Sequence, residues 1–206
     1  MEPDSDSAYR SGSYGGVPLS SPSPGRNRRA DAARNRARIV AAARTLFAER
    51  GTEVQLPEVA RAAGVGIGTV YRHFPAHADL VEAAAEYRFA EIEEFARTEC
   101  LRAEPGQALA RYLRHVGEVL AADRGLSASI EVARQSAGSE PRGEARDRLE
   151  SAISAVIARD RAAGALRDDC TVADAYMIVG AISATIRNGA GDWRRLLDIT
   201  FDGLRP

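Results

Sequence analysis

The chain has 206 residues, of which 45% are apolar, and carries a formal net charge of −1 at pH 7. That length fits one medium domain or a small domain joined to a larger one, and the apolar content is sufficient for a packed core. The near-neutral charge excludes a protein that is basic throughout. The apolar runs are too short or too interrupted by charge to predict a membrane span.

The two cysteines, Cys100 and Cys170, lie far apart in the chain. Their spacing predicts neither a structural disulfide nor a zinc site, and free thiols are typical of a reducing compartment. Residues 1–25 contain no apolar segment of the kind found in signal peptides. We therefore expect a cytoplasmic protein.

The N-terminal part of the chain is polar at first and then basic. Residues 1–30 are rich in Ser, Gly and Pro, and bury too little apolar surface to offset the entropy cost of ordering, so we expect a disordered tail. Residues 26–80 contain ten arginines and five acidic residues, which leaves the remainder net acidic. Such a basic head fits a nucleic-acid-binding segment. The arginine run that includes Arg34 is interpreted either as an arm on DNA phosphates or as the solvated start of a helix.

The next elements are three short predicted helices within residues 31–78. The first spans about residues 32–50, where Ile39, Ala43, Leu46 and Phe47 share one face. Residues 55–74 then read as helix, glycine-containing turn and helix, a spacing typical of the helix-turn-helix motif. The second of these helices buries Val70 and Phe74 and leaves six residues on its other faces: Ile67, Gly68, Thr69, Tyr71, Arg72 and His73.

This motif resembles a known family. The run Ala-Gly-Val-Gly-Ile-Gly-Thr-Val-Tyr-Arg-His-Phe at residues 63–74, with residues 42–51 before it and residues 75–80 after it, is similar to the signature of the tetracycline-repressor (TetR) family of transcription regulators. The resemblance covers about residues 34–85. It implies a homodimer, a double-stranded DNA operator and a small-molecule effector as partners.

The resemblance also implies a set of DNA-contacting positions. Gly66 stands where many relatives have serine, and His77 where lysine is common. Ile67 is interpreted as a specificity position, Tyr71 as a DNA contact or a core residue, and Gly68 as a close approach to DNA or a neutral substitution. Because Pro75 interrupts the helix between His73 and His77, their spacing does not predict a metal site. The full predicted set is Arg34, Gln55, Gly66, Ile67, Gly68, Thr69, Tyr71, Arg72, His73 and His77.

The body, residues 79–206, shows helical patterns throughout, so the predicted fold is all-α with about nine helices. A long fourth helix, about residues 77–102, links head and body. We expect an effector pocket between body helices, or ordinary core aromatics, at Phe89, Phe95, Tyr112, His115, Tyr176 and Met177. The helix at about residues 172–188 is apolar on nearly every side, which predicts either a dimer interface shared with the last helix or the core of a monomer. The predicted interface residues are Tyr176, Val179, Ile186, Trp193, Leu197 and Phe201.

No catalytic motif and no cofactor-binding loop is recognisable, so we expect neither enzymatic activity nor a cofactor. The expected function is that of a sequence-specific regulator of transcription, a repressor released from a palindromic operator by a small molecule. The alternative is a helical ligand-binding or protein-interaction module without specific DNA binding.

Overall fold

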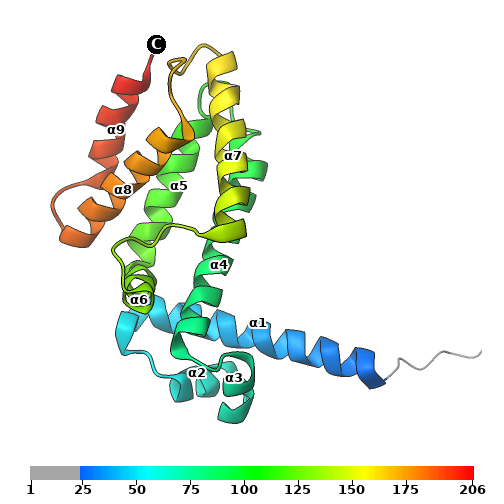
Figure 1. The fold of residues 1–206 in the computed structure, drawn as a ribbon. Helices are drawn as coiled ribbons and strands as arrows, with labels where there is room; N and C mark the ends of the chain where they lie inside the picture. The colour runs from blue at the N-terminus through cyan, green and yellow to red at the C-terminus, as the bar shows by residue number, and fades with distance from the viewer. Residues whose placement is uncertain (1–23) are drawn as a thin grey trace, which may run out of the picture.

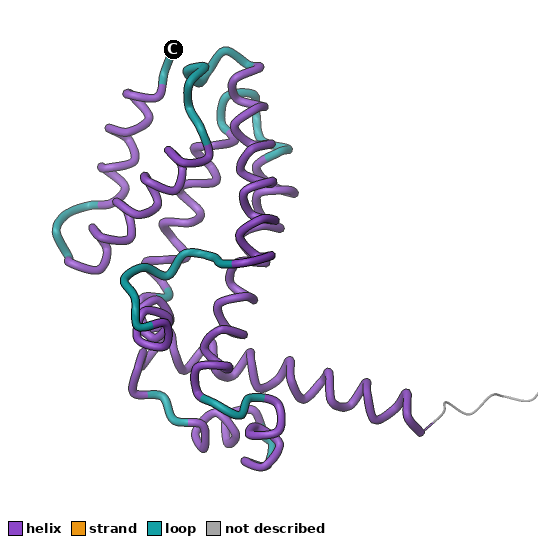
Figure 2. Tube along the Cα trace, viewed as in Figure 1, coloured by secondary structure: helices purple, strands orange, loops and turns teal. Residues whose placement is uncertain are grey.

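The computed structural model describes residues 24–206, with side chains from residue 28 onward. Within this range the chain forms nine α-helices and no strand, which confirms the predicted all-α fold (Figures 1 and 2). The helices are α1 Pro24–Arg50, α2 Leu56–Ala63, α3 Ile67–His73, α4 His77–Phe95, α5 Ala108–Ala122, α6 Arg124–Arg134, α7 Gly143–Ala162, α8 Val172–Asn188 and α9 Trp193–Leu204.

Helix α1 begins eight residues earlier than the sequence pattern indicated, at Pro24 instead of about residue 32. The end of the expected disordered tail, residues 24–30, is therefore helical, while residues 1–23 lie outside the described part. Proline suits the first turn of a helix, and the arginines and alanines that follow have high helix propensity. The first half of α1 consequently runs past the rest of the head (Figure 1).

Helices α1, α2 and α3 form the head around a small apolar core. Ile39 and Phe47 of α1, Val59 of α2 and Val70 of α3 are completely buried. A short 3-10 turn, Gly51–Glu53, connects α1 to the segment that enters α2. The face of the first helix that the sequence predicted to be apolar is thus the face that packs in the core of the head.

Helix α4 starts in the head and runs into the body (Figure 1). The Asp79 carboxylate caps its first turn by accepting a hydrogen bond of 2.8 Å from the Ala76 N–H. The helix contacts α1 in the head and α6 and α7 in the body, and continues as a π-helical turn, Ala96–Cys100. Helix α4 therefore connects the body to the head as one continuous helix.

Helices α5–α9 form the body, with α5 packed against α7, α8 and α9. The first turn of α5 is held by the buried Asp160 of α7, whose carboxylate accepts hydrogen bonds from the Ala108 N–H (3.1 Å) and the Leu109 N–H (2.8 Å). A negative charge at this position also interacts favourably with the helix dipole.

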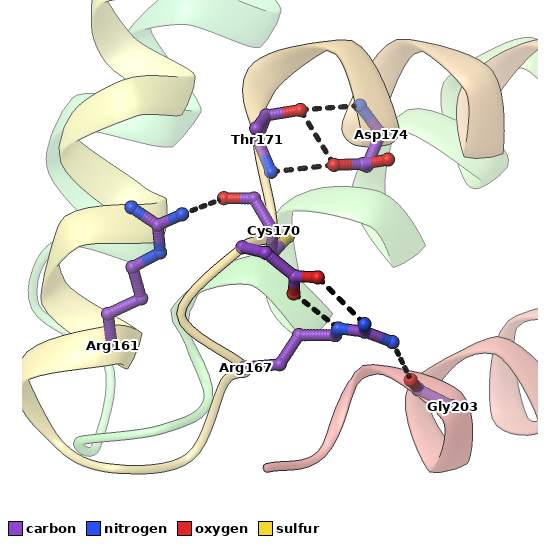
Figure 3. A network of polar contacts seen from close by, with 7 residues as sticks. Arg161, Arg167, Cys170, Thr171, Asp174 and Gly203 are labelled. Carbon is purple, nitrogen blue, oxygen red and sulfur yellow. Dashed lines mark hydrogen bonds and ion pairs between the residues drawn. The ribbon is translucent and has the colours of Figure 1, made fainter.

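The connection from α7 to α8 is fixed by a polar network (Figure 3). Thr171 and Asp174 form a capping box at the start of α8, with 2.7 Å between the Thr171 nitrogen and the carboxylate. Arg161 donates to the Cys170 carbonyl, and Arg167 donates to the Gly203 carbonyl of α9 at 3.5 Å. This connection therefore ties the ends of α7, α8 and α9 together.

Cys100 and Cys170 are free, buried thiols, and burial raises the pKa of both. None of the described helices is long and apolar enough to cross a membrane.

Candidate nucleic-acid interface and ligand cavity

The helix-turn-helix segment is capped at both ends of α2. At the start of α2 the Gln55 N–H donates to the Glu58 carboxylate at 3.0 Å, and Arg50 donates to the same carboxylate at 2.7 Å. These contacts, led by the Arg50 hydrogen bond, lower the pKa of Glu58. Gly64 ends α2 in the left-handed conformation, with φ of 62°, where glycine avoids the penalty that a side chain would incur.

Helix α3 divides its residues between core and surface as predicted. Val70 and Phe74 are buried, whereas Ile67 and Tyr71, one turn apart, are 40% and 50% exposed. The remaining predicted positions of the motif are exposed at Gln55, Gly66, Gly68 and Arg72, and half-buried at Thr69 and His73. Because these exposed residues lie together on the second helix of a helix-turn-helix, this face of α3 is a candidate contact surface.

His77 is an exception among the predicted DNA-contacting residues. Its Nε2 lies 3.0 Å from the Val54 carbonyl oxygen, and its ring stands edge-on to Phe47 with 5.5 Å between ring centroids. The side chain therefore fastens the start of α4 to the core of the head. The structure thus assigns one ring nitrogen of His77 to a contact inside the protein, and a DNA contact by this side chain stays a prediction.

The arginines of α1 have two different roles. Arg38 donates to the Gly64 carbonyl at 3.2 Å, and the Arg36 guanidinium lies 5.2 Å from the centroid of the Phe74 ring, so both support the motif. Arg34 is exposed and pairs with Asp31 on the same helix. Arg28 is also exposed and forms no ion pair within the described part of the chain. The start of α1 therefore offers free positive charge beside the head.

The body contains a cavity of about 440 Å³ walled by α4, α5, α7, α8 and the loop between α6 and α7. Four of the predicted pocket residues line it: Phe89, Tyr112, Tyr176 and Met177. Its volume lies within the range of small-molecule sites, roughly 300–1,000 Å³.

Phe95 and His115 do not line this cavity. Their rings stack on each other with 3.7 Å between centroids and an interplanar angle of 11°. Burial lowers the pKa of His115. The structure therefore places these two predicted pocket residues outside this cavity, in a ring pair between α4 and α5.

Arg88 is a cavity residue that sequence reasoning missed. It is 1% exposed and lies on α4 in the buried stripe formed with Leu80, Ala84 and Ile92. Its Nη1 donates to Ser127 Oγ at 3.0 Å, and its Nη2 donates to the Ser139 carbonyl at 3.1 Å. An arginine at a core position of an amphipathic helix was the available signal, since arginine is rarely buried without a specific partner.

Half of the predicted interface residues of α8 and α9 are core residues of the single chain. Ile186, Trp193 and Leu197 are buried without any partner chain, and the Trp193 ring covers Gly117 so closely that a Cβ there would lie 2.2 Å from it. Tyr176, Val179 and Phe201 are half-buried. The apolar side chains that these two helices leave exposed are instead Met177 and Ile199, at 68% and 55%.

In the described part of the chain, no group of three His, Cys, Asp or Glu residues is placed to hold a metal ion.

The three-helix head, with its capped turn and exposed α3, defines a helix-turn-helix DNA-binding protein that carries a helical body. Residues 39–84 match the family of bacterial regulatory proteins named tetR, and residues 104–206 match the SbtR-like C-terminal domain of transcriptional regulators. The chain belongs to the TetR family and is a DNA-binding transcriptional regulator. Family and fold are those of proteins that are generally not enzymes.

Similar proteins of known structure cover nearly the whole fold. A TetR regulator from Mycobacterium vanbaalenii is 36% identical, with a TM-score of 0.63 over 86% of this chain and 99% of that chain. A TetR regulator from Streptomyces coelicolor is 33% identical, with a TM-score of 0.65 over 83% of this chain and 98% of that chain. An HTH-type transcriptional regulator of Staphylococcus aureus is 45% identical over 53 residues, which are 25% of this chain and 29% of the relative.

Proposed function

We propose that this regulator acts as a homodimeric repressor that a small molecule bound in the body releases from a pseudo-palindromic operator. The observation that carries the proposal is the exposed face of α3, where Ile67 and Tyr71 project from a head whose core and caps are complete without them. In a dimer, two such helices would enter successive major grooves about 34–36 Å apart.

The contacts would be divided between bases and backbone. Ile67 suits an apolar feature such as a thymine methyl, and Thr69 and Tyr71 bring hydroxyl groups to base edges or phosphates. Arg72 on α3 and Arg28 at the start of α1 would neutralise phosphates, and DNA binding would therefore depend on the salt concentration. A Cβ added at Gly68 would meet no atom within 4 Å, so the backbone of α3 is accessible there to a close neighbour.

The exposed apolar residues of α8 and α9 support dimerisation. Met177 of α8 and Ile199 of α9 are among the few large apolar side chains that the described surface exposes, and Ala173 and Ala181 extend the exposed face along α8. Burial of such a face in a four-helix contact would remove its apolar area from water. The two heads would then be held at a fixed separation.

Two contacts support a connection between the cavity and the heads. Helix α4 contributes Arg88 and Phe89 to the cavity wall and is fastened to the head by His77. Helix α6 touches the head where Gly125 meets the Phe47 carbonyl, since a Cβ on Gly125 would lie 2.0 Å from that oxygen. A ligand that favours another position of α4 or α6 would change the separation of the heads, and thus their fit to the operator.

The test compares two equally exposed tyrosines. Tyr71 on α3 and Tyr87 on α4 are each 50% exposed, so replacement of either by alanine leaves the core intact. Anisotropy with labelled fragments from upstream of the regulator's own gene should show specific, salt-dependent binding by the wild type and by Tyr87→Ala, and at least a tenfold loss in Tyr71→Ala. Equal binding by both variants would refute the role of α3. A salt slope near zero for the wild type would instead indicate a module without DNA binding.

A further inference from the structure

Two buried polar atoms of residues that line the body cavity have no hydrogen-bond partner in the described part of the chain: Nε of Arg88 on α4 and Oη of Tyr176 on α8. Both residues line the same cavity but come from different helices. An unsatisfied buried donor is unfavourable, and nearly all buried polar groups in folded proteins have a partner. Two such donors at one cavity therefore indicate an absent acceptor.

Arg88 is held rigidly and keeps its charge. Ser127 Oγ and the Ser139 carbonyl each accept one hydrogen bond from a terminal nitrogen, which leaves Nε as the one guanidinium nitrogen without a partner among the described residues. The nearest carboxylate oxygen, on Asp123, is 3.9 Å away, beyond hydrogen-bonding distance. Burial lowers the pKa of Arg88 to about 10, so the guanidinium is protonated at neutral pH. The cavity wall thus contains a fixed positive charge that the protein neutralises only partly.

Tyr176 supplies a neutral donor. Burial raises the pKa of its phenol to about 12, so the hydroxyl keeps its proton at neutral pH. The Arg146 guanidinium lies 5.4 Å from the centroid of the ring, which is therefore covered on that side. Its hydroxyl has no partner among the described residues.

The other residues of the cavity wall indicate the polarity and the charge of the ligand. Phe89, Ile92, Val116, Leu149 and Ile153 present apolar surface, and all five are at most 6% exposed. The same wall carries the guanidinium groups of Arg88, Arg146 and Arg187 and one carboxylate, that of Glu140, so its net charge is positive. An apolar wall with net positive charge favours a molecule with an apolar body and an anionic end. It disfavours a cation, because the charge of Arg88 would repel it.

We infer that the cavity binds an apolar monocarboxylate, whose carboxylate accepts hydrogen bonds from the Arg88 Nε–H and the Tyr176 hydroxyl. The inference deepens the proposed function and rests on it, because it assigns a chemical class to the small molecule of the body cavity. Guanidinium–carboxylate hydrogen bonds are among the strongest in proteins, and the fixed donors need little reorganisation to form them.

The experiment measures binding of matched probes to the full-length protein by isothermal titration calorimetry. The probes are hexanoate, octanoate, decanoate and phenylbutyrate, each with its methyl ester, and octanol and octylamine. The expected result is saturable binding of at least one acid, at least tenfold tighter than its methyl ester, and no binding of octylamine. Equal or tighter binding of the esters would overturn the inference, as would absence of binding by all four acids up to about 1 mM.

Two variants test the donors separately. Tyr176→Phe removes only the unpaired hydroxyl, so the variant should fold as stably as the wild type. Its affinity for the acid should fall by roughly tenfold or more, while its affinity for the ester should not change. Tyr87→Phe, which changes an exposed tyrosine outside the cavity, is the control. Arg88→Lys keeps the charge but lacks Nε, and its affinity for the acid should be lower than that of Tyr176→Phe. Unchanged acid affinity in Tyr176→Phe contradicts the assignment, whether or not Arg88→Lys folds.

Operator anisotropy on the same preparations separates this inference from the proposed function. Specific DNA binding without any acid binding would overturn the carboxylate inference and leave the repressor proposal standing. Acid binding with the predicted donor dependence, in a protein without specific DNA binding, would support the cavity chemistry and refute the repressor proposal.

Discussion

The contact between Gly125 of α6 and the head gives the sharpest stability prediction. In the variant Gly125→Ala the new Cβ would lie 2.0 Å from the Phe47 carbonyl oxygen and 2.9 Å from the Gly51 backbone. Carbon and oxygen atoms approach to about 3.3 Å at closest, so α6 and the end of α1 must separate by more than about 1 Å. The obstructing atoms belong to the backbone, so no side-chain rotation relieves the clash.

The magnitude follows from the cost of overpacking. Forced displacement of a packed contact costs about 1–3 kcal/mol, and the helix-propensity gain from glycine to alanine offsets less than about 1 kcal/mol of this. A net loss of about 2 kcal/mol lowers the melting temperature of a chain of this size by roughly 4–8 °C. Calorimetry at pH 7 measures the shift.

The matched control is Gly68→Ala in α3, where a Cβ meets no atom within 4 Å. There the same substitution should leave the melting temperature unchanged or raise it by roughly 1–4 °C. If Gly125→Ala melts at or above the wild-type temperature, α6 does not hold the head by this contact. The proposed role of α6 in connecting the cavity to the heads would then be refuted.

Three further predictions concern the head, the body and the response to pH. Gly68→Ala should weaken operator binding by roughly tenfold in anisotropy despite its intact fold, because the added methyl meets the DNA; unchanged affinity would show that α3 approaches less closely. Asp160→Ala should lower the free energy of unfolding in urea by about 2–4 kcal/mol, because the Ala108 and Leu109 N–H groups lose their buried acceptor; a loss below about 0.5 kcal/mol would contradict the cap. Burial lowers the pKa of His115 below its ordinary 6.5, so its contribution to stability is present above pH 6.5 and is lost as the pH falls. The variant His115→Gln should therefore lose less stability than the wild type between pH 7 and 5, and parallel profiles would refute this.

The sequence predicted the helices well where local chemistry decides their ends. Gly64 in a left-handed conformation, the Thr171–Asp174 capping box and the apolar spacing of Val70 and Phe74 each act within a few residues, so they can be read from the chain itself. The early start of α1 at Pro24 was missed because composition was weighed above propensity: a polar, arginine-rich stretch can be helical while it is fully exposed.

The side-chain placements that the sequence did not reveal have a common physical cause. His77 hydrogen-bonds Val54, and Trp193 fills the space that Gly117 leaves, so each role depends on a residue distant in the sequence. The stacking of Phe95 on His115 across two helices is of the same kind. Periodicity shows which face of a helix is apolar, but not which neighbour covers it, and this second question decides between core, cavity and interface.

The energetics of release show why the two unpaired donors matter. To move a two-state regulator from almost fully bound to almost fully released, a ligand must favour one conformer by about 10⁴-fold, or about 5.5 kcal/mol. Apolar burial alone would contribute similarly to both conformers if the cavity persists in each, and would shift nothing. Hydrogen bonds to a charged group contribute about 1.5–3 kcal/mol each, and they depend steeply on geometry. Arg88 on α4 and Tyr176 on α8 belong to different helices. A small displacement of α4 relative to α8 would therefore break one of the two bonds to a shared carboxylate. With one cavity in each protomer of a dimer, loss of one such bond per cavity gives about 3–6 kcal/mol, which is the magnitude that release requires.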